Sequence, residues 1–222
     1  MTPNVIDIYH GNTVNDFAAL KAAGILGVIH KCTQGANIVD PAYAARRKLA
    51  TDAGLLWGAY TFNTGDPIVS QVNEFMSHAE PDDKTLMCLD FEDNPSSQMS
   101  LAQCRQFLQS CDLQLGRKVV LYSGNRIKDL LGSQVDMIIG TRRLWLAQYG
   151  PVPVVQASWR GDGQWLWQYS ETGRLPGTDG AIDLDFFAGT PDELSAQWSG
   201  AAPTVVAAAQ PETIVQKIEG DL

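Results

Sequence analysis

The segment Met87-Cys88-Leu89-Asp90-Phe91-Glu92-Asp93 places two carboxylates at alternate positions where an apolar run ends. Side chains two residues apart in a β-strand point to the same face of the sheet. Asp90 and Glu92 should therefore project side by side, with their Cα atoms roughly 7 Å apart. The run predicts a buried strand with a carboxylate pair at its carboxyl end. The alternative interpretation is a strand that runs out into an acidic turn at Asp93-Asn94-Pro95.

Eight apolar, β-rich runs of this kind occur along the chain, and helical patterns separate the earlier ones. This alternation favours a parallel sheet, and eight strands favour a closed (β/α) barrel. The predicted strands are Val5–Tyr9, Gly27–Cys32, Leu56–Phe62, Thr85–Glu92, Val119–Ser123, Leu144–Gln148, Leu166–Ser170 and Ile182–Phe187.

Helical periodicity predicts helices at Asp16–Ala23, Pro41–Ala53, Ile68–Ala79 and Leu101–Leu115. The last of these follows Ser100, with Gln103 three residues on, which is a capping-box pattern. The later gaps between strands are rich in Gly, Pro and Thr and show no helical period. We therefore expect an irregular TIM-like α/β barrel with helices missing in its last third.

The chain of 222 residues suits one large domain, which we place at residues 1–199. From Gly200 the sequence changes to small residues, and residues 213–222 could form a short amphipathic helix. We interpret residues 200–222 as a flexible tail or linker. A formal net charge of -9 gives no support for binding nucleic acid or an anionic membrane. No apolar run reaches transmembrane length, and no secretory signal peptide is visible.

The four cysteines predict buried free thiols and not a disulfide framework. Cys104 and Cys111 would lie roughly 10 Å apart along one helix, which is too far for a bridge. His10, His30 and His78 show no zinc-binding spacing. We expect neither a metal nor a cofactor.

Functional groups of a parallel barrel gather at the carboxyl ends of its strands. Here those ends combine carboxylates with aromatic residues, which suits a carbohydrate better than a phosphate because phosphate sites need Gly-rich loops and basic groups. The candidate residues are Asp7, Lys31, Tyr60, Phe62, Asp90, Glu92, Tyr122, Trp145, Tyr149, Gln168, Asp183 and Asp185. Singly, the tyrosines could be core residues and Lys31 an ion-pair partner. Asp183 lies in an apolar strand, where a carboxylate needs partners or a function.

Read in order, the strand ends resemble those of the glycoside hydrolase family 25 lysozymes, the Chalaropsis-type muramidases. The resemblance covers roughly residues 4 to 198. Matching stretches include Ile6-Asp7-Ile8-Tyr9-His10, Val28-Ile29-His30-Lys31-Cys32-Thr33-Gln34-Gly35, Gly58-Ala59-Tyr60-Thr61-Phe62, Leu89-Asp90-Phe91-Glu92, Leu144-Trp145-Leu146-Ala147-Gln148-Tyr149, Trp165-Leu166-Trp167-Gln168-Tyr169-Ser170 and Ile182-Asp183-Leu184-Asp185-Phe186-Phe187.

The resemblance implies an enzyme that cleaves the β-1,4 bond between N-acetylmuramic acid and N-acetylglucosamine in peptidoglycan. By position, Glu92 is the general acid, and Asp90 stabilises positive charge at the anomeric carbon or orients the N-acetyl group. Asp7 and Asp183 complete the acidic cluster. The remaining candidates would bind substrate: Lys31, Tyr60, Phe62, Tyr122, Trp145, Tyr149, Gln168 and Asp185. We expect a monomer that acts on glycan strands of the cell wall and reaches them by lysis or a dedicated export route.

The chain departs from the usual family pattern at three positions. Tyr9 stands where a serine commonly follows the first motif, Gln34 replaces a glutamate, and Asp185 replaces an asparagine. None of these is an acid-base position, so we expect them to affect substrate contacts and not activity itself.

Two alternatives remain open at this stage. A chitinase-type barrel would carry the pattern Asp-x-x-Asp-x-Asp-x-Glu, but Thr85 and Cys88 occupy its first two acidic positions. A catalytically inactive, sugar-binding barrel would be expected to lack the acid, yet Glu92 is present.

Overall fold

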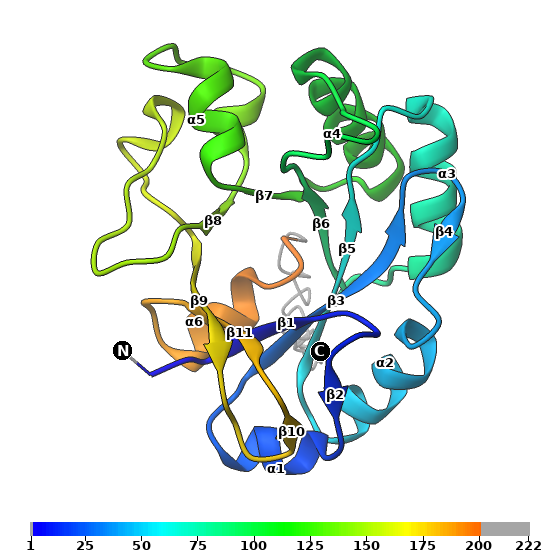
Figure 1. Ribbon diagram of the computed structural model, residues 1–222, viewed down its shortest axis with the longest axis vertical. Helices are drawn as coiled ribbons and strands as arrows, with labels where there is room; N and C mark the ends of the chain where they lie inside the picture. Colours follow the sequence, from blue (N-terminus) through cyan, green and yellow to red (C-terminus); the bar gives the residue numbers. More distant parts are fainter. Residues whose placement is uncertain (1, 201–222) are drawn as a thin grey trace, which may run out of the picture.

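The computed structural model describes residues 2–200, in which eight strands close into a barrel (Figure 1). The ring closes because β1 pairs with both β3 and β11, while β4 (Ile38–Val39) adds to the outer edge of β3. All eight predicted strands are confirmed, with shifted ends. They are β1 Val5–Ile8, β3 Gly27–Gln34, β5 Leu56–Phe62, β6 Leu86–Asp90, β7 Val120–Ser123, β8 Leu144–Ala147, β9 Leu166–Gly173 and β11 Ile182–Phe186.

The last strand departs from the predicted parallel arrangement. Neighbouring barrel strands from β1 through β9 pair in parallel, but β11 is antiparallel to both β9 and β1. The segment between β9 and β11 is short and folds back through β10 (Thr178–Asp179), which pairs with β2 (Thr13–Val14). A parallel crossover needs a dozen or more residues, whereas a hairpin needs only a few. The length of this connection therefore reverses the last strand.

Six α-helices occur within residues 2–200: α1 Phe17–Ala22, α2 Tyr43–Asp52, α3 Ile68–Ala79, α4 Leu101–Leu115, α5 Asn125–Leu131 and α6 Pro191–Gln197. The first four confirm the predicted helices, and the capping box at Ser100 is present. The helices α5 and α6 were not predicted. As expected, no α-helix separates β8 from β9 or β9 from β11; the first gap holds only the 3₁₀ turn Ala157–Trp159. A second 3₁₀ turn, Ile139–Thr141, precedes β8.

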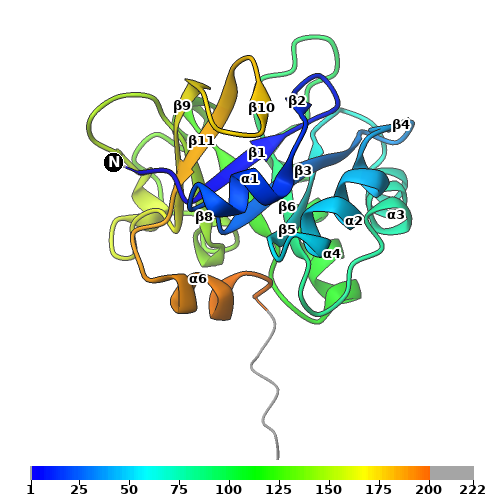
Figure 2. The ribbon, with the colours of Figure 1, turned by 90° about the horizontal axis from the view of Figure 1, so that it is seen from below.

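The barrel is closed at the amino ends of its strands by α6 and the residue after it. Trp198 donates from its indole N–H to the Trp57 carbonyl at 2.7 Å and packs against Gly27, where an added Cβ would lie only 2.6 Å from the indole ring. In Figure 2, α6 lies on the side of the barrel away from β2 and β10. Only the end of the barrel where the parallel strands finish is therefore left open.

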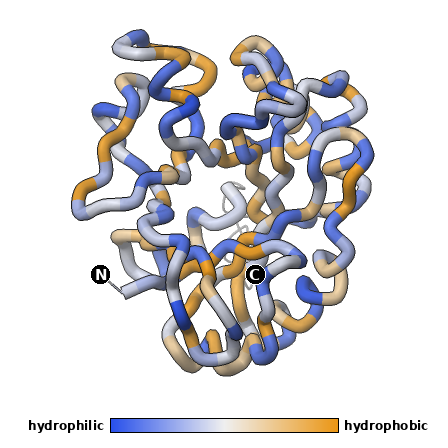
Figure 3. Tube along the Cα trace, in the orientation of Figure 1, coloured by the Kyte–Doolittle hydropathy of each residue, from blue (hydrophilic) through white to orange (hydrophobic). Residues whose placement is uncertain are grey.

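Two packed layers surround the strands. One fills the barrel interior and includes Val5, Ile29, Leu86 and Trp145, and the other joins the outer strand faces to the helices. Hydrophobic stretches follow the strands and alternate with hydrophilic loops (Figure 3). All four cysteines are buried free thiols, as predicted. None of the helices in residues 2–200 is long and apolar enough to cross a membrane. Apart from Gly200, the predicted tail and its short helix lie outside the described residues.

Candidate active site

A pocket of about 470 Å³ opens at the carboxyl ends of the parallel strands. Of the twelve residues predicted from the sequence, eleven line this pocket: Asp7, Lys31, Tyr60, Phe62, Asp90, Glu92, Tyr122, Trp145, Tyr149, Gln168 and Asp183. Tyr9, which was expected to affect substrate contacts, lines the pocket as well, and so does Glu171, which was not predicted. These residues come from all eight barrel strands and the loops that follow them, and they form a single cluster.

The reversed direction of β11 decides the places of its two aspartates. Asp183 lies opposite Asp7, near the start of β11, and so reaches the pocket. Asp185 lies opposite Val5, deeper in the barrel, and its exposed fraction is 0%. We expected Asp185 to contact substrate, but it does not line the pocket. It supports the pocket from below.

Glu92 lies just beyond β6, which ends at Asp90 and not at Glu92 as predicted. The same-face spacing nevertheless persists, because the Phe91 N–H donates to the Tyr122 carbonyl at 2.9 Å and the Phe91 ring is buried in the core. Two side-chain amides fix the Glu92 backbone. Its carbonyl accepts from Asn63 Nδ2 at 3.0 Å and from Gln98 Nε2 at 3.3 Å.

The environment of Glu92 favours its protonated form. Burial raises the pKa of this carboxyl, and the negative charges of Asp93 and Asp183 raise it further. A half-buried carboxyl with a raised pKa can keep a proton to donate at mildly acidic pH.

Asp90 is a buried carboxylate with a free oxygen. Its Oδ1 has no hydrogen-bond partner among the described residues. Burial and the charge of Glu92 raise its pKa, while Lys31 lowers it. The Lys31 ammonium donates to Gln34 Oε1 at 2.6 Å and lies 5.3 Å from the Phe62 ring centroid. Lys31 is therefore held beside Asp90 without forming a direct ion pair to it.

A chain of hydrogen bonds orients Asp7. The Tyr122 hydroxyl donates to Gln168 Oε1 at 2.9 Å, which fixes the amide so that Gln168 Nε2 donates to Asp7 Oδ2 at 2.8 Å. Tyr149 adds a longer hydroxyl contact to the same Gln168 oxygen at 3.3 Å. Tyr122 and Gln168 are both buried, so their contribution is to hold the carboxylate in place.

The aromatic residues divide into a floor and a rim. Trp145 is 1% exposed and packs edge-on against Tyr122, with ring centroids 4.5 Å apart. Tyr149 and Tyr9 are 52% and 44% exposed and can offer a ring face to a sugar. Tyr9 lies two residues after Asp7, just beyond the end of β1, and this spacing was the signal that could have identified it.

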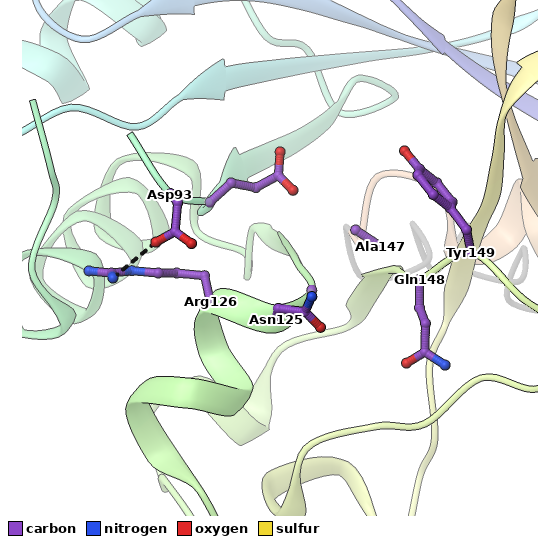
Figure 4. Close-up of a pocket in the computed structure, with 8 residues that line it drawn as sticks. Asp93, Asn125, Arg126, Ala147, Gln148 and Tyr149 are labelled. Carbon is purple, nitrogen blue, oxygen red and sulfur yellow. Dashed lines mark hydrogen bonds and ion pairs between the residues drawn. The ribbon is translucent and has the colours of Figure 1, made fainter. Parts of the chain in front are cut away.

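A second recess of about 680 Å³ adjoins the pocket and shares Glu92 and Tyr149 with it. Asp93 and Arg126 form one wall and are paired at 3.1 Å; Ala147 and Gln148 lie across from them (Figure 4). Glu92 therefore has open space on both sides. This recess was not predicted, although Asn125 and Arg126 follow the end of β7 and the strand-end rule applies to them too.

Within residues 2–200 no group of three or more His, Cys, Asp or Glu side chains is arranged to hold a metal ion. The sequence model of the family described as "Glycosyl hydrolases family 25" matches residues 6–178. This chain belongs to glycosyl hydrolase family 25. It is therefore a glycoside hydrolase, and the pocket at the strand ends is its candidate active site.

Two curated relatives of this family 25 chain are lysozymes. Lysozyme M1 of Streptomyces globisporus is 29% identical over 207 residues, which cover 86% of this chain and 69% of the relative. The autolytic lysozyme of Clostridium acetobutylicum is 31% identical over 188 residues, which cover 82% of this chain but only 55% of the relative. The chain thus spans between about half and two thirds of the length of these proteins.

Solved structures agree with the barrel over nearly the whole described chain. The lysozyme from Streptomyces coelicolor has a TM-score of 0.79 and 29% identity, covering 89% of this chain and 97% of that one. A family 25 lysozyme from Aspergillus fumigatus has a TM-score of 0.76 and 26% identity, covering 90% and 100%.

Proposed function

We propose that this chain is an N-acetylmuramidase that hydrolyses the β-1,4 bond between N-acetylmuramic acid and N-acetylglucosamine in peptidoglycan. The observation that carries the proposal is the position of Glu92, half-buried between two recesses with Asp90 beside it on the pocket side. A glycan strand lying across both recesses would present a glycosidic bond to Glu92. Cleavage would then occur within the strand.

Glu92 is the proposed general acid. It donates its proton to the glycosidic oxygen as the bond to the anomeric carbon breaks, so the leaving sugar departs as a neutral alcohol. The raised pKa of Glu92 keeps that proton available. Afterwards the Glu92 carboxylate takes a proton from the attacking water, which restores the acid for the next turnover.

Asp90 is proposed to serve the substrate acetamido group. Its unpartnered Oδ1 can accept a hydrogen bond from the acetamido N–H. The acetamido oxygen then attacks the anomeric carbon, and the negative charge of Asp90 stabilises the positive charge that develops on the ring formed. We prefer this route to a covalent enzyme intermediate, because Asp90 and Glu92 come from one strand end and a covalent route needs a second carboxylate beneath the anomeric carbon.

The other lining residues are proposed to bind the glycan. Tyr9 and Tyr149 offer exposed rings, and Asp7 and Asp183 offer carboxylate oxygens for sugar hydroxyl or amide groups. Residues 1–199 form the catalytic domain in this proposal, 200–222 a tail, and the chain acts as a monomer at the cell wall, released by lysis or a dedicated export route.

The test is the chemical identity of the new chain ends. Purified peptidoglycan and chitin are incubated in parallel with the protein, the products are reduced with borohydride, and the reduced amino sugars are identified after acid hydrolysis. The proposal expects reduced muramic acid from peptidoglycan and no products from chitin. Reduced glucosamine and chitin cleavage would indicate a chitinase-type enzyme, and binding without new ends would indicate a sugar-binding barrel.

A further inference from the structure

Asp185 is a fully buried carboxylate beneath the candidate active site. It is 0% exposed, and its Oδ1 accepts a hydrogen bond from the Trp145 indole N–H at 2.6 Å. Its other oxygen, Oδ2, is also buried and accepts no hydrogen bond from an N–H or an alcohol O–H of the described residues. A buried polar atom without a partner costs about 1–3 kcal/mol, so this oxygen needs an explanation.

Asp7 supplies that explanation. In the antiparallel pair of β1 and β11, Val5 lies opposite Asp185 and Asp7 lies opposite Asp183. Asp7 and Asp185 are thus diagonal neighbours on the inner face of the barrel, where long side chains reach one another. A hydrogen bond between the two carboxyl groups raises the pKa of Asp7 and lowers that of Asp185, so Asp7 holds the proton and donates it to Asp185. An ionised carboxylate can only accept, so this bond requires a proton on one of the two groups.

We propose that Asp7 and Asp185 share a proton, and that Asp185 is a positioning residue that uses this bond and its bond to Trp145 to hold Asp7 and the pocket floor in place. The positioning follows from the contacts. Trp145 packs on Tyr122 at 4.5 Å and on Tyr60 at 6.4 Å between ring centroids, and both tyrosines line the pocket. The catalytic consequence rests on the proposed muramidase function, but the shared proton does not.

The groups that face Asp185 favour retention of the proton. They are Asp7 on β1, Asp183 on β11 itself, Tyr169 on β9 and Trp145 on β8. Burial raises the pKa of Asp185 to about 8; the bonds to Trp145 and Asp7 act the other way, and the charge of Asp183 adds to the rise. Burial and the charges of Asp185 and Asp183 also raise the pKa of Asp7 well above its usual value. Lys31 is the one cation among the described residues that line the pocket, and it acts on Asp90.

Two substitutions distinguish a role of the hydrogen bonds of Asp185 from a role of its side-chain volume alone. Asp185→Asn keeps the size and both bonds, because its amide oxygen can accept from Trp145 while its NH₂ group donates to Asp7. Asp185→Leu keeps volume but removes both bonds. Asp185→Asn reverses the direction of the bond to Asp7 but keeps the contact, so it should hold Asp7 in place as the wild type does below neutral pH.

The primary measurement is the Trp145 indole N–H resonance in a proton–nitrogen correlation spectrum of the full chain, assigned with Trp145→Phe and followed from about pH 5 to about pH 9. We expect a shift in the wild type with a midpoint near the pKa of about 8 for Asp185, and its disappearance in Asp185→Asn. A resonance that does not move in the wild type, or that moves equally in the asparagine variant, would overturn the shared proton. This readout does not depend on any activity.

The second measurement is hydrolysis of peptidoglycan at mildly acidic pH. Asp185→Asn should keep kcat within about threefold of the wild type, whereas Asp185→Leu should lose at least about tenfold. A large loss in Asp185→Asn with a native circular dichroism spectrum would overturn the positioning role. A wild type that cleaves nothing would refute the muramidase assignment and leave the spectroscopic result standing.

Discussion

The free energy of unfolding should fall as the pH rises from about 6.5 to about 7.5. The pKa of Asp185 is raised from the ordinary 3.8 to about 8, so the folded protein keeps a proton in this range that the unfolded chain has already lost. Stability linked to a raised pKa is complete below 3.8 and is lost as the pH approaches 8. One such proton corresponds to about 1.4 kcal/mol for each pH unit.

The chosen range reduces the opposing contribution of histidine. Burial lowers the pKa of His30 from 6.5 to about 4, so the unfolded chain binds an additional proton below pH 6.5 and stability falls there as the pH decreases. Above pH 6.5 that contribution to the slope fades, and the change is nearly complete by about pH 7.5. Asp7, whose pKa is also raised by burial, acts in the same direction as Asp185. The expected loss is therefore about 1 kcal/mol or more over the unit, a large share of a typical domain stability.

Urea unfolding followed by circular dichroism at several pH values measures this slope. Asp185→Asn should make the slope shallower by about 1.4 kcal/mol per pH unit, since one linked proton is removed. Asp162→Asn is the matched control, because Asp162 is exposed and lies away from the pocket. A stability that is flat or rising over this range, or an Asp185→Asn slope equal to that of the wild type, would refute the reasoning.

Three further predictions concern the active site, a buried ion pair outside it, and residues 201–222. Asp90→Asn should lower kcat by about 10²–10³-fold with little change in KM in steady-state assays, because its charge acts on the transition state, and a pure KM effect would contradict that role. Arg105→Ala should cost about 2 kcal/mol in urea unfolding, because Asp136 is buried and accepts two Arg105 bonds at 2.7 and 2.5 Å, whereas Lys48→Ala should cost less than about 0.5 kcal/mol. Removal of residues 201–222 should leave the melting temperature and the hydrolysis of soluble peptidoglycan fragments unchanged. A large fall in the melting temperature would show that the domain extends beyond residue 199.

The barrel could be predicted because its strands are long apolar runs whose order and number allow few arrangements. The pair Asp90 and Glu92 could be placed even though β6 ends at Asp90, because the alternation of faces continues through Phe91. The direction of β11 was predicted wrongly. Alternating strands and helices predict parallel neighbours, but the connection between β9 and β11 is too short for a parallel crossover.

The depth of a side chain along its strand could not be read from the sequence. Asp183 and Asp185 have the same spacing and neighbours of the same kind, yet only the register against β1 makes one a pocket residue and the other a buried support. The second recess forms between α5 and the loop after β8, on either side of Glu92. The separation of these two segments depends on tertiary packing, which no local sequence pattern indicates. The start of α6 could have been predicted, because Thr190 and Glu193 form a capping box with Pro191 between them.

The most direct test of the central claim, that Glu92 is the general acid of a muramidase, is the release of muramic-acid reducing ends by Glu92→Gln. The amide keeps the shape but cannot donate the proton, so the rate should fall by about 10²–10⁴-fold with an unchanged circular dichroism spectrum. Glu171→Gln is the matched control, because Glu171 lines the same pocket and contacts Tyr149 at 3.2 Å but lies on the rim. Its rate should stay within about tenfold of the wild type. Near-normal release by a folded Glu92→Gln variant would contradict the account.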